Sequence, residues 1–256
     1  MTEPPDEQAA GGRRAELVAA LARVRNRIAV ACIAVGRDPT EVRLLPVTKT
    51  FPALDVVLLA DLGLFDFAEA RNSEAAAKVA EVAALRPLLG GPGVGVRWHM
   101  VGRVQRNKAR SVAQWAAQVQ SVDSSRLAEA LDRAAGAARE SGRRHAALDV
   151  LVQASLDGDP ARGGCPLPEL EALADRMAAA PHLRLEGVMA IAPLGIAPGA
   201  AFATLGEAAA RLRRSHPGAV EVSAGMSGDL EQAIAHGSTC VRVGTALLGG
   251  RPLTSC

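Results

Sequence analysis

The chain has 256 residues, of which 49% are hydrophobic and 2% aromatic, so Ala, Val and Leu must fill most of a sizeable core. Its 29 Lys and Arg residues nearly balance 27 Asp and Glu residues, which excludes a strong attraction to nucleic acid or to a membrane surface. Without an uncharged apolar window of membrane length or a secretory signal, the sequence predicts a cytoplasmic protein that does not span a membrane. The four cysteines are scattered, so no metal site is expected.

The predicted elements begin after a polar stretch. Residues 1–13 are predicted to be a disordered tail, which leaves residues 14–256 as a single domain. Apolar residues recur at helical spacing from residue 15 to about residue 35. Short apolar runs then alternate with Ala-rich amphipathic runs, so strands are predicted at 42–47, 64–67, 96–101, 118–122, 147–153, 185–189, 220–223 and 240–243, and helices at 54–62, 73–85, 103–115, 125–141, 168–179, 199–215 and 228–235.

This alternation predicts parallel β–α–β units. Eight strands with one unit per roughly 30 residues match a single α/β domain, a (β/α)8 TIM barrel with an extra N-terminal helix. The alternative is a doubly wound open sheet, which would carry a Gly-rich loop after the first strand. The chain has TKTFP at that position (residues 48–52), so the barrel is favoured.

Functional groups of such a barrel lie at the carboxyl ends of its strands. Lys49 closes the apolar run LLPVT and is the candidate nucleophile, because a lysine is almost never fully buried without a partner. The alternative is a rim lysine with its ammonium group in water. The other strand ends hold Glu69, His99, Asp123, Gln153, Met189, Ser223, Gly244 and Thr245.

Two stretches near the C-terminus indicate a phosphate site. In VEVSAGMSGDLEQAIAHG (220–237), Ser223, Gly225 and Ser227 precede a helix predicted to start near residue 228. Their hydroxyls and open backbone amides suit an anion at a helix N-terminus. In CVRVGTALLGGR (240–251), Gly244 and Thr245 follow the eighth strand in the same way. Either turn alone is explained by ordinary helix capping, but the loops after strands 7 and 8 together are the recurrent phosphate site of this fold.

An amine facing a phosphate site suits pyridoxal 5′-phosphate (PLP). The aldehyde would meet Lys49, and the phosphate would meet the two C-terminal loops. Arg242 alternates with valines in the eighth strand and is expected to point into the barrel or to lie at its end. Facing a pyridine nitrogen, a guanidinium can only donate, so it would weaken the ring as an electron sink. The alternative is a salt bridge between Arg242 and a carboxylate.

Six motifs follow one another along the chain. They are LLPVTKTFP (44–52), RWHMVGRVQRNKAR (97–110), SVDSSRLAEAL (121–131), LEGVMAIAP (185–193), EVSAGMSGDLEQAIAHGST (221–239) and VRVGTALLGGR (241–251). In this order they resemble the pyridoxal phosphate homeostasis proteins, whose barrel is similar to the N-terminal domain of alanine racemase, and the resemblance runs from about residue 23 to residue 251.

The resemblance implies that Lys49 holds PLP as a Schiff base, with Ser223, Ser227, Gly244 and Thr245 at the phosphate, Arg242 near the pyridine nitrogen, and His99 and Met189 lining the pocket. A histidine packed beside Trp98 is the alternative for His99.

Two departures from the family pattern concern the site. The family has Gly-Glu-Asn after the second strand, where this chain has Ala68, Glu69 and Ala70, and the nearest substitute for the asparagine is Asn72. In residues 103–108, Gln105, Asn107 and Lys108 fit the family pattern, but Arg103 and Arg106 add charge. PLP binding is still expected.

The resemblance implies a protein that holds PLP and delivers it to apo PLP-enzymes with little turnover. A monomer is expected, because the second domain that is the usual dimer scaffold is missing from this chain. An amino-acid racemase is the alternative, and it needs an acid or base on each face of the substrate carbon. In alanine racemase a tyrosine from a second domain serves one face. This chain has no tyrosine and ends shortly after the eighth strand, so the carrier is favoured. A Schiff-base aldolase without PLP is a third reading.

Overall fold

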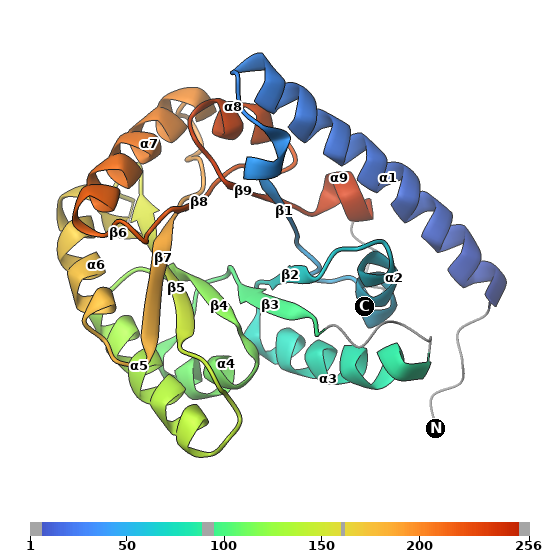
Figure 1. Ribbon diagram of the computed structural model, residues 1–256, viewed down its shortest axis with the longest axis horizontal. Helices are drawn as coiled ribbons and strands as arrows, with labels where there is room; N and C mark the ends of the chain where they lie inside the picture. The colour runs from blue at the N-terminus through green and yellow to red at the C-terminus, as the bar shows by residue number, and fades with distance from the viewer. Residues whose placement is uncertain (1–6, 89–94, 160–161, 251–256) are drawn as a thin grey trace.

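The computed structural model describes residues 7–88, 95–159 and 162–250, in which parallel strands form a ring surrounded by helices (Figure 1). The eight predicted strands are confirmed, and the nearly closed barrel has the predicted (β/α)8 architecture. The ring closes between the first two strands, where the Thr48 N–H donates to the Ala68 carbonyl. The strand order around the ring is β1 (Arg43–Pro46), β9 (Cys240–Val243), β8 (Glu221–Ser223), β7 (Leu183–Met189), β5 (Leu148–Ser155), β4 (Gln118–Val122), β3 (Arg97–Met100) and β2 (Asp66–Glu69).

The helices follow the predicted alternation. A two-residue strand that was not predicted, β6 (Cys165–Pro166), adds to the edge of β5. The helices are α1 (Glu7–Ala34), α2 (Ala53–Asp61), α3 (Asn72–Leu88), α4 (Ala109–Trp115), α5 (Ser125–Glu140), α6 (Leu170–Ala178), α7 (Pro198–Ser215), α8 (Leu230–Ala235) and α9 (Thr245–Leu248).

The predicted disordered tail is wrong for residues 7–13, which form the first turns of α1. Arg13 holds this end of the helix against the barrel, because its guanidinium donates to the Asp55 carboxylate at 2.7 Å and to the Leu248 carbonyl at 2.9 Å. Residues 1–6 lie outside the described residues. The helix predicted at 103–115 is also shorter than expected, since residues 103–105 lack regular structure and a single 3-10 turn (Arg106–Lys108) precedes α4.

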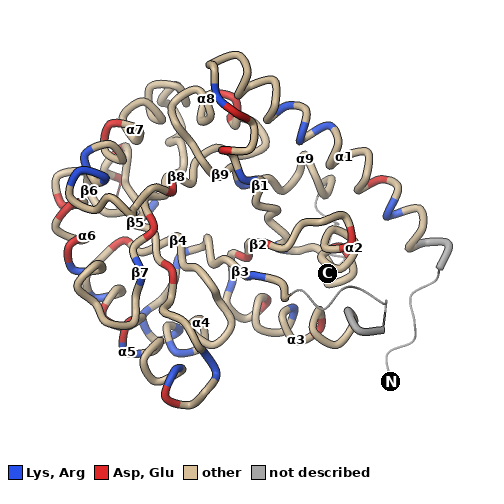
Figure 2. Tube along the Cα trace, viewed as in Figure 1, with Lys and Arg blue, Asp and Glu red and all other residues tan. Residues whose placement is uncertain are grey.

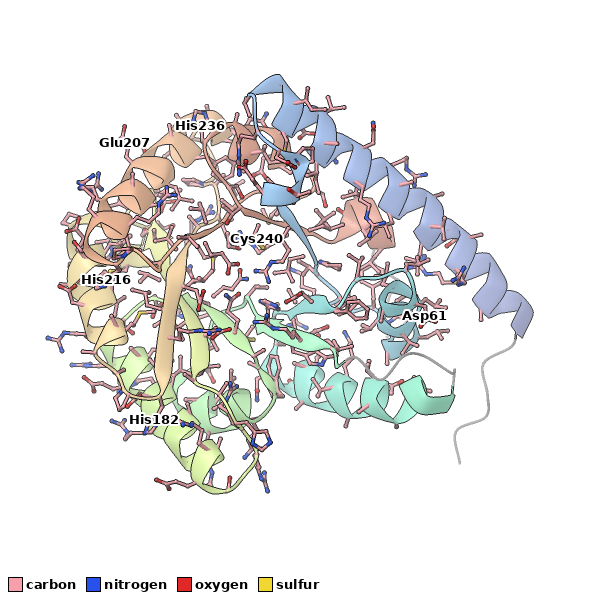
Figure 3. The ribbon with its side chains drawn as sticks, viewed as in Figure 1. Asp61, His182, Glu207, His216, His236 and Cys240 are labelled. Atoms are coloured by element: carbon pink, nitrogen blue, oxygen red, sulfur yellow. The ribbon has the colours of Figure 1, made fainter. Side chains whose placement is uncertain are left out.

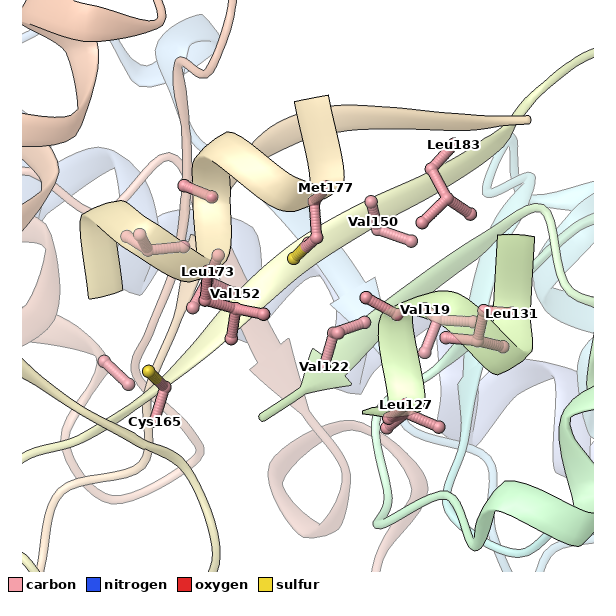
Figure 4. Packing of buried hydrophobic residues seen from close by; sticks show 14 of the residues in the cluster. Val119, Val122, Leu127, Leu131, Val150, Val152, Cys165, Leu173, Met177 and Leu183 are labelled. Carbon is pink, nitrogen blue, oxygen red and sulfur yellow. The ribbon is translucent and has the colours of Figure 1, made fainter. Parts of the chain in front are cut away.

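The apolar core lies between the outer face of the barrel and the helices. Val119 and Val150 of neighbouring strands pack against Leu131 of α5 and Met177 of α6 (Figure 4). A second cluster joins α1, α2 and β9 on the other side of the barrel. Because alternate strand residues supply this core, the remaining strand residues are left to fill the interior.

The barrel interior is largely polar. Gln118, Gln120 and Arg242 are buried there, and Leu45, Ala68 and Cys240 form only a small apolar cluster. Figure 3 shows Cys240 inside the ring of strands. Buried polar groups are retained in proteins when they are hydrogen-bonded, and those of the interior are connected to one another as described below.

In the parts of the chain that the structure describes, no helix is long and apolar enough to cross a bilayer. Within the same residues, no group of three or more His, Cys, Asp and Glu side chains has the arrangement of a metal site.

Candidate functional site

Lys49 and Thr245 lie at the same end of the barrel. Strands β1 and β9 are parallel neighbours, with Pro46 paired to Val243, and the Val47 N–H donates to the Val243 carbonyl at 2.9 Å. Lys49 follows Pro46 by three residues and Thr245 follows Val243 by two. Both residues therefore sit beyond the carboxyl ends of adjacent strands, where functional groups of this fold collect.

Lys49 is half-buried, and its backbone is held on both sides. The Thr48 N–H donates to the Ala68 carbonyl, and the Lys78 ammonium donates to the Thr48 carbonyl at 2.6 Å. Thr50 has φ of +69°, a left-handed conformation that is unfavourable for a β-branched residue and is enriched at functional sites. The Lys49 side chain itself has no hydrogen bond or ion pair among the described residues. Its amine is available for a ligand.

Glu69 faces α3 and does not contribute to the barrel mouth. One of its carboxylate oxygens accepts from the Lys78 ammonium at 2.6 Å and from the Thr48 hydroxyl at 2.7 Å. The other oxygen is buried and has no partner among the described residues. Glu69 and Lys78 therefore act on the backbone next to Lys49. The role of Lys78 is not predicted in the sequence analysis. The available signal is its spacing of three and four residues from Ala75 and Val82, which places Lys78 on the buried face of α3.

Arg242 points into the barrel, as predicted, and is almost completely buried. Its guanidinium donates to the Ser223 hydroxyl and carbonyl, both at 2.7 Å, and to the Ala190 carbonyl at 2.8 Å. Burial lowers the pKa of Arg242 from its ordinary value. No carboxylate among the described residues lies within ion-pairing distance of Arg242, so the alternative of a salt bridge is wrong.

The structure places the Ser223 hydroxyl inside the barrel, at the end of β8. This hydroxyl is fully buried, donates to Gln120 Oε1 at 2.7 Å and accepts from Arg242. Gln120 in turn donates to Gln118 Oε1 at 2.8 Å. Ser223 therefore orients Arg242, and the contact of Ser223 with a phosphate stays a prediction.

His99 belongs to the same buried network. One ring nitrogen lies 2.6 Å from the Asp66 carboxylate and the other lies 2.7 Å from Gln118 Oε1. Both nitrogens are therefore occupied by side chains of the barrel interior. A chain of hydrogen bonds runs from Asp66 through His99, two glutamines and Ser223 to Arg242. No local pattern in the sequence predicts it, because its members come from five strands.

The loops after β8 and β9 contact each other. The Ala246 N–H donates to the Ser227 hydroxyl at 3.2 Å, and Thr245 is exposed beside it. The N–H groups of Ser227, Gly228 and Thr245 donate to no acceptor among the described residues. Several backbone N–H groups are therefore unpaired among the described residues in the two loops where a phosphate site is predicted from the sequence.

The helix after this loop differs from the prediction. It begins at Leu230, two residues after the predicted start, and has six residues. Its N-cap residue, Asp229, accepts from the Met226 N–H at 2.6 Å, so that amide is unavailable to an anion. The glycine at position 225 is required for packing, because its φ is +89° and a Cβ would lie 2.6 Å from the Cβ of Ala233.

The remaining predicted residues differ in position. Gly244 is half-buried at the end of β9, and a Cβ there would lie 3.5 Å from the Val47 carbonyl oxygen. Met189 ends β7 beside Ser223 and is almost fully buried. Asn72, the nearest substitute for the family asparagine, donates its amide N–H to the Ser111 hydroxyl and accepts from the Trp115 indole.

Comparison with known proteins gives a consistent result. Residues 20–252 match the family model described as alanine racemase, N-terminal domain. A pyridoxal phosphate homeostasis protein of Mycobacterium leprae is 50% identical over 249 residues, which cover 96% of each chain. Both matches extend over the whole barrel.

Two solved structures are similar along nearly the whole chain. A protein of unknown function from Bifidobacterium adolescentis aligns with a TM-score of 0.84 and 31% identity, covering 96% of this chain and 98% of the other. PipY of Synechococcus elongatus PCC7942, solved with PLP bound, aligns with a TM-score of 0.71 and 34% identity, covering 87% of this chain and 100% of PipY.

Proposed function

Because the chain belongs to the pyridoxal phosphate homeostasis proteins, within the alanine racemase N-terminal domain family, we propose that it binds PLP through a Schiff base at Lys49. The protein functions in PLP homeostasis, and PLP is its cofactor. The observation that carries the assignment of Lys49 is its position beyond the end of β1, the strand next to the one that leads to Thr245, with an amine that no other side chain of the described residues contacts through a hydrogen bond or ion pair.

The donors at this end of the barrel fit PLP. When bound, PLP supplies an aldehyde that reacts with a primary amine and an aromatic ring that withdraws electrons. Lys49 would react with the aldehyde, while the free N–H groups of Ser227, Gly228 and Thr245 would hold the phosphate. The pairing of Lys78 with Glu69 and Thr48 would keep the backbone of Lys49 in place during binding.

The position of Arg242 supports the proposal that the protein has little or no catalytic turnover. Its guanidinium can only donate, so beside a pyridine nitrogen it would keep that nitrogen unprotonated. Ser223 orients the guanidinium from within the barrel, and Gln120 orients Ser223. Met189 lies next to Ser223 and would line the pocket, while His99 would act through the glutamines and not by direct contact. A carrier needs no strong electron sink, whereas racemisation does.

Apo PLP-enzymes are the proposed recipients, and the cytoplasm is the proposed compartment. The near balance of charges in the chain supports a small-molecule ligand over nucleic acid or a membrane surface. The racemase alternative lacks support, since the chain has no tyrosine to act opposite Lys49.

The test is spectroscopic. Protein mixed with PLP should show the visible absorption band of a Schiff base, and Lys49→Ala should lack it. Arg133→Ala is the matched control, because Arg133 is an exposed cation that has no partner among the described residues. Borohydride reduction followed by peptide mass spectrometry should find the pyridoxyl group on Lys49. An unchanged band in Lys49→Ala would reject the proposal, and interconversion of D- and L-amino acids at ordinary enzyme rates would reject the carrier.

A further inference from the structure

A cavity of about 900 Å³ lies outside the candidate PLP site. It is bounded by the start of α3, by residues 103–108 between β3 and α4, and by the start of α5. None of its lining residues belongs to β1 or to the loops after β8 and β9. Its volume is in the range of small-molecule sites, about 300–1,000 Å³.

The charge of this cavity is strongly positive. Arg103, Arg106, Lys108 and Arg126 line it, and Asp123 is the single carboxylate among the lining residues. None of the four cations has an ion pair or a hydrogen bond among the described residues. Figure 2 shows Lys and Arg positions around α4. Four cations on one cavity repel one another, and an anion would relieve that repulsion.

The backbone at the start of α5 adds to this field. Ser124 is the N-cap residue, but its hydroxyl donates to the Asp123 carboxylate at 3.0 Å and does not cap the helix. The N–H groups of Ser125 and Arg126 consequently have no acceptor among the described residues. These groups open at the positive end of a 16-residue helix, directly beside the four cations.

The floor of the cavity is apolar. Met100, Val112 and Leu127 are almost fully buried beneath it. Asn72 forms part of the wall, and its amide is held by the Trp115 indole at 2.9 Å and by the Ser111 hydroxyl at 3.1 Å. An apolar floor below a ring of cations suits a ligand with both a flat apolar part and a phosphate.

From these features, the geometry points to a second ligand site, one that binds a small phosphorylated molecule with a planar ring. The phosphate lies among Arg103, Arg106 and Arg126, and the ring lies on the apolar floor. A second molecule of PLP and a nucleoside phosphate share this chemistry. Lys49 does not line this site, which goes beyond the proposed function.

Equilibrium dialysis with adenosine monophosphate (AMP) and with PLP tests the site in the full chain. The test variant is Arg103→Ala/Arg106→Ala. Its matched control, Arg133→Ala/Arg176→Ala, removes two exposed arginines that have no partner among the described residues and do not line the cavity. The test variant should bind at least one of the two ligands at least tenfold more weakly, while the control should stay within about twofold of the wild type. Arg126→Ala, on a different element, should act in the same direction.

The outcomes separate the two sources. One AMP per chain that is lost in the test variant identifies a nucleoside phosphate. If the wild type binds two PLP molecules per chain and the test variant binds one, the cavity holds a second PLP. If PLP binding is lost only in Lys49→Ala, the PLP bound by the wild type occupies the Lys49 site. Adenosine and pyridoxal, which lack the phosphate, should bind at least tenfold more weakly than their phosphates. The inference is overturned if neither ligand binds, or if the test variant and control bind both ligands equally.

Discussion

The two ends of the barrel differ in how their charged side chains are paired. At the amino-terminal end Arg43 contacts both Asp66, at 3.1 Å, and Glu221. At the carboxyl-terminal end Lys49 has no partner among the described residues, and the Thr245 N–H donates to no acceptor there. The same eight strands therefore have two different ends. At the amino-terminal end, called the saturated end, Arg43 is paired with carboxylates, and at the carboxyl-terminal end, called the open end, Lys49 and the Thr245 N–H are unpaired among the described residues.

This difference separates stability from binding. Partly buried charges that pair with one another hold the strands together, whereas donors that stay free are ready for a ligand. Arg242 lies between the two ends. Its buried guanidinium is held by the hydrogen-bond network of the barrel interior, and Arg242 precedes Thr245 by three residues at the carboxyl end of β9. The following variants test whether the two properties can be changed separately.

The largest loss of stability is expected for Lys78→Met, which breaks the buried ion pair between Lys78 and Glu69 next to Lys49. Glu69 would remain fully buried without its ion-pair partner, and breaking a buried pair in this way costs about 3–5 kcal/mol. PLP affinity should fall as well, because Lys78 also holds the Thr48 carbonyl. Urea denaturation and PLP titration measure the two effects.

Lys108→Met is the matched control for Lys78→Met. Lys108 is exposed and unpaired among the described residues, so its removal should change the free energy of unfolding by less than about 0.5 kcal/mol. The double variant Glu69→Gln/Lys78→Met should recover part of the loss, since it leaves no buried charge. Equal stabilities of Lys78→Met and the control would contradict the structural role of the pair.

A smaller loss is expected for Arg43→Met at the saturated end. Its side chain is 31% exposed, so solvent screens the charges left on Asp66 and Glu221, and the cost should be about 2 kcal/mol. PLP affinity should stay within about twofold of the wild type, because Arg43 lies at the opposite end from Lys49. A parallel loss of PLP affinity would show that the two ends are coupled.

The pH dependence of stability gives a second test at the saturated end. Burial alone would raise the pKa of Asp66, but the hydrogen bond with His99 and the charges of His99, Arg43 and Arg97 lower it below its ordinary value. Asp66 therefore contributes stability that is present above the ordinary carboxyl pKa of about 3.9 and is lost as pH falls below it toward the lowered value.

Asp66→Asn should remove this part of the pH dependence. For one group the slope cannot exceed about 1.4 kcal/mol per pH unit, so the difference between wild type and variant should narrow gradually below pH 4. Urea denaturation at intervals between pH 6 and pH 3 measures it. A difference that stays constant over this range would show that the pKa of Asp66 is not lowered by folding.

The smallest effect is expected for Ser227→Ala at the open end. The hydroxyl accepts from the Ala246 N–H at 3.2 Å and joins the two loops proposed to hold the phosphate. Loss of one such hydrogen bond corresponds to about 0.5–1 kcal/mol, so PLP affinity should fall about two- to fivefold. The free energy of unfolding should change by less than about 0.5 kcal/mol. The opposite result, lower stability with unchanged affinity, would place Ser227 among the structural residues.

Much of the architecture follows from the amino-acid sequence. The alternation of short apolar runs with amphipathic helices is a local property, and it predicts the eight strands and the end of the barrel at which Lys49 and Thr245 meet. The inward direction of Arg242 also follows, because a charge between two valines of a strand has to face away from the apolar core. Helix ends are less well predicted, as the late start of α4 shows, because the polar residues 103–108 read equally well as helix or loop.

Side-chain partners depend on strands that are remote in sequence and adjacent in the barrel. Ser223 and Gln120 are 103 residues apart, and His99 and Asp66 are 33 apart. No periodicity within one element encodes such contacts, so the hydrogen bond between the Ser223 hydroxyl and Arg242 could not be predicted from the sequence. Local periodicity decides which way a residue points, and closure of the barrel decides which partner it meets.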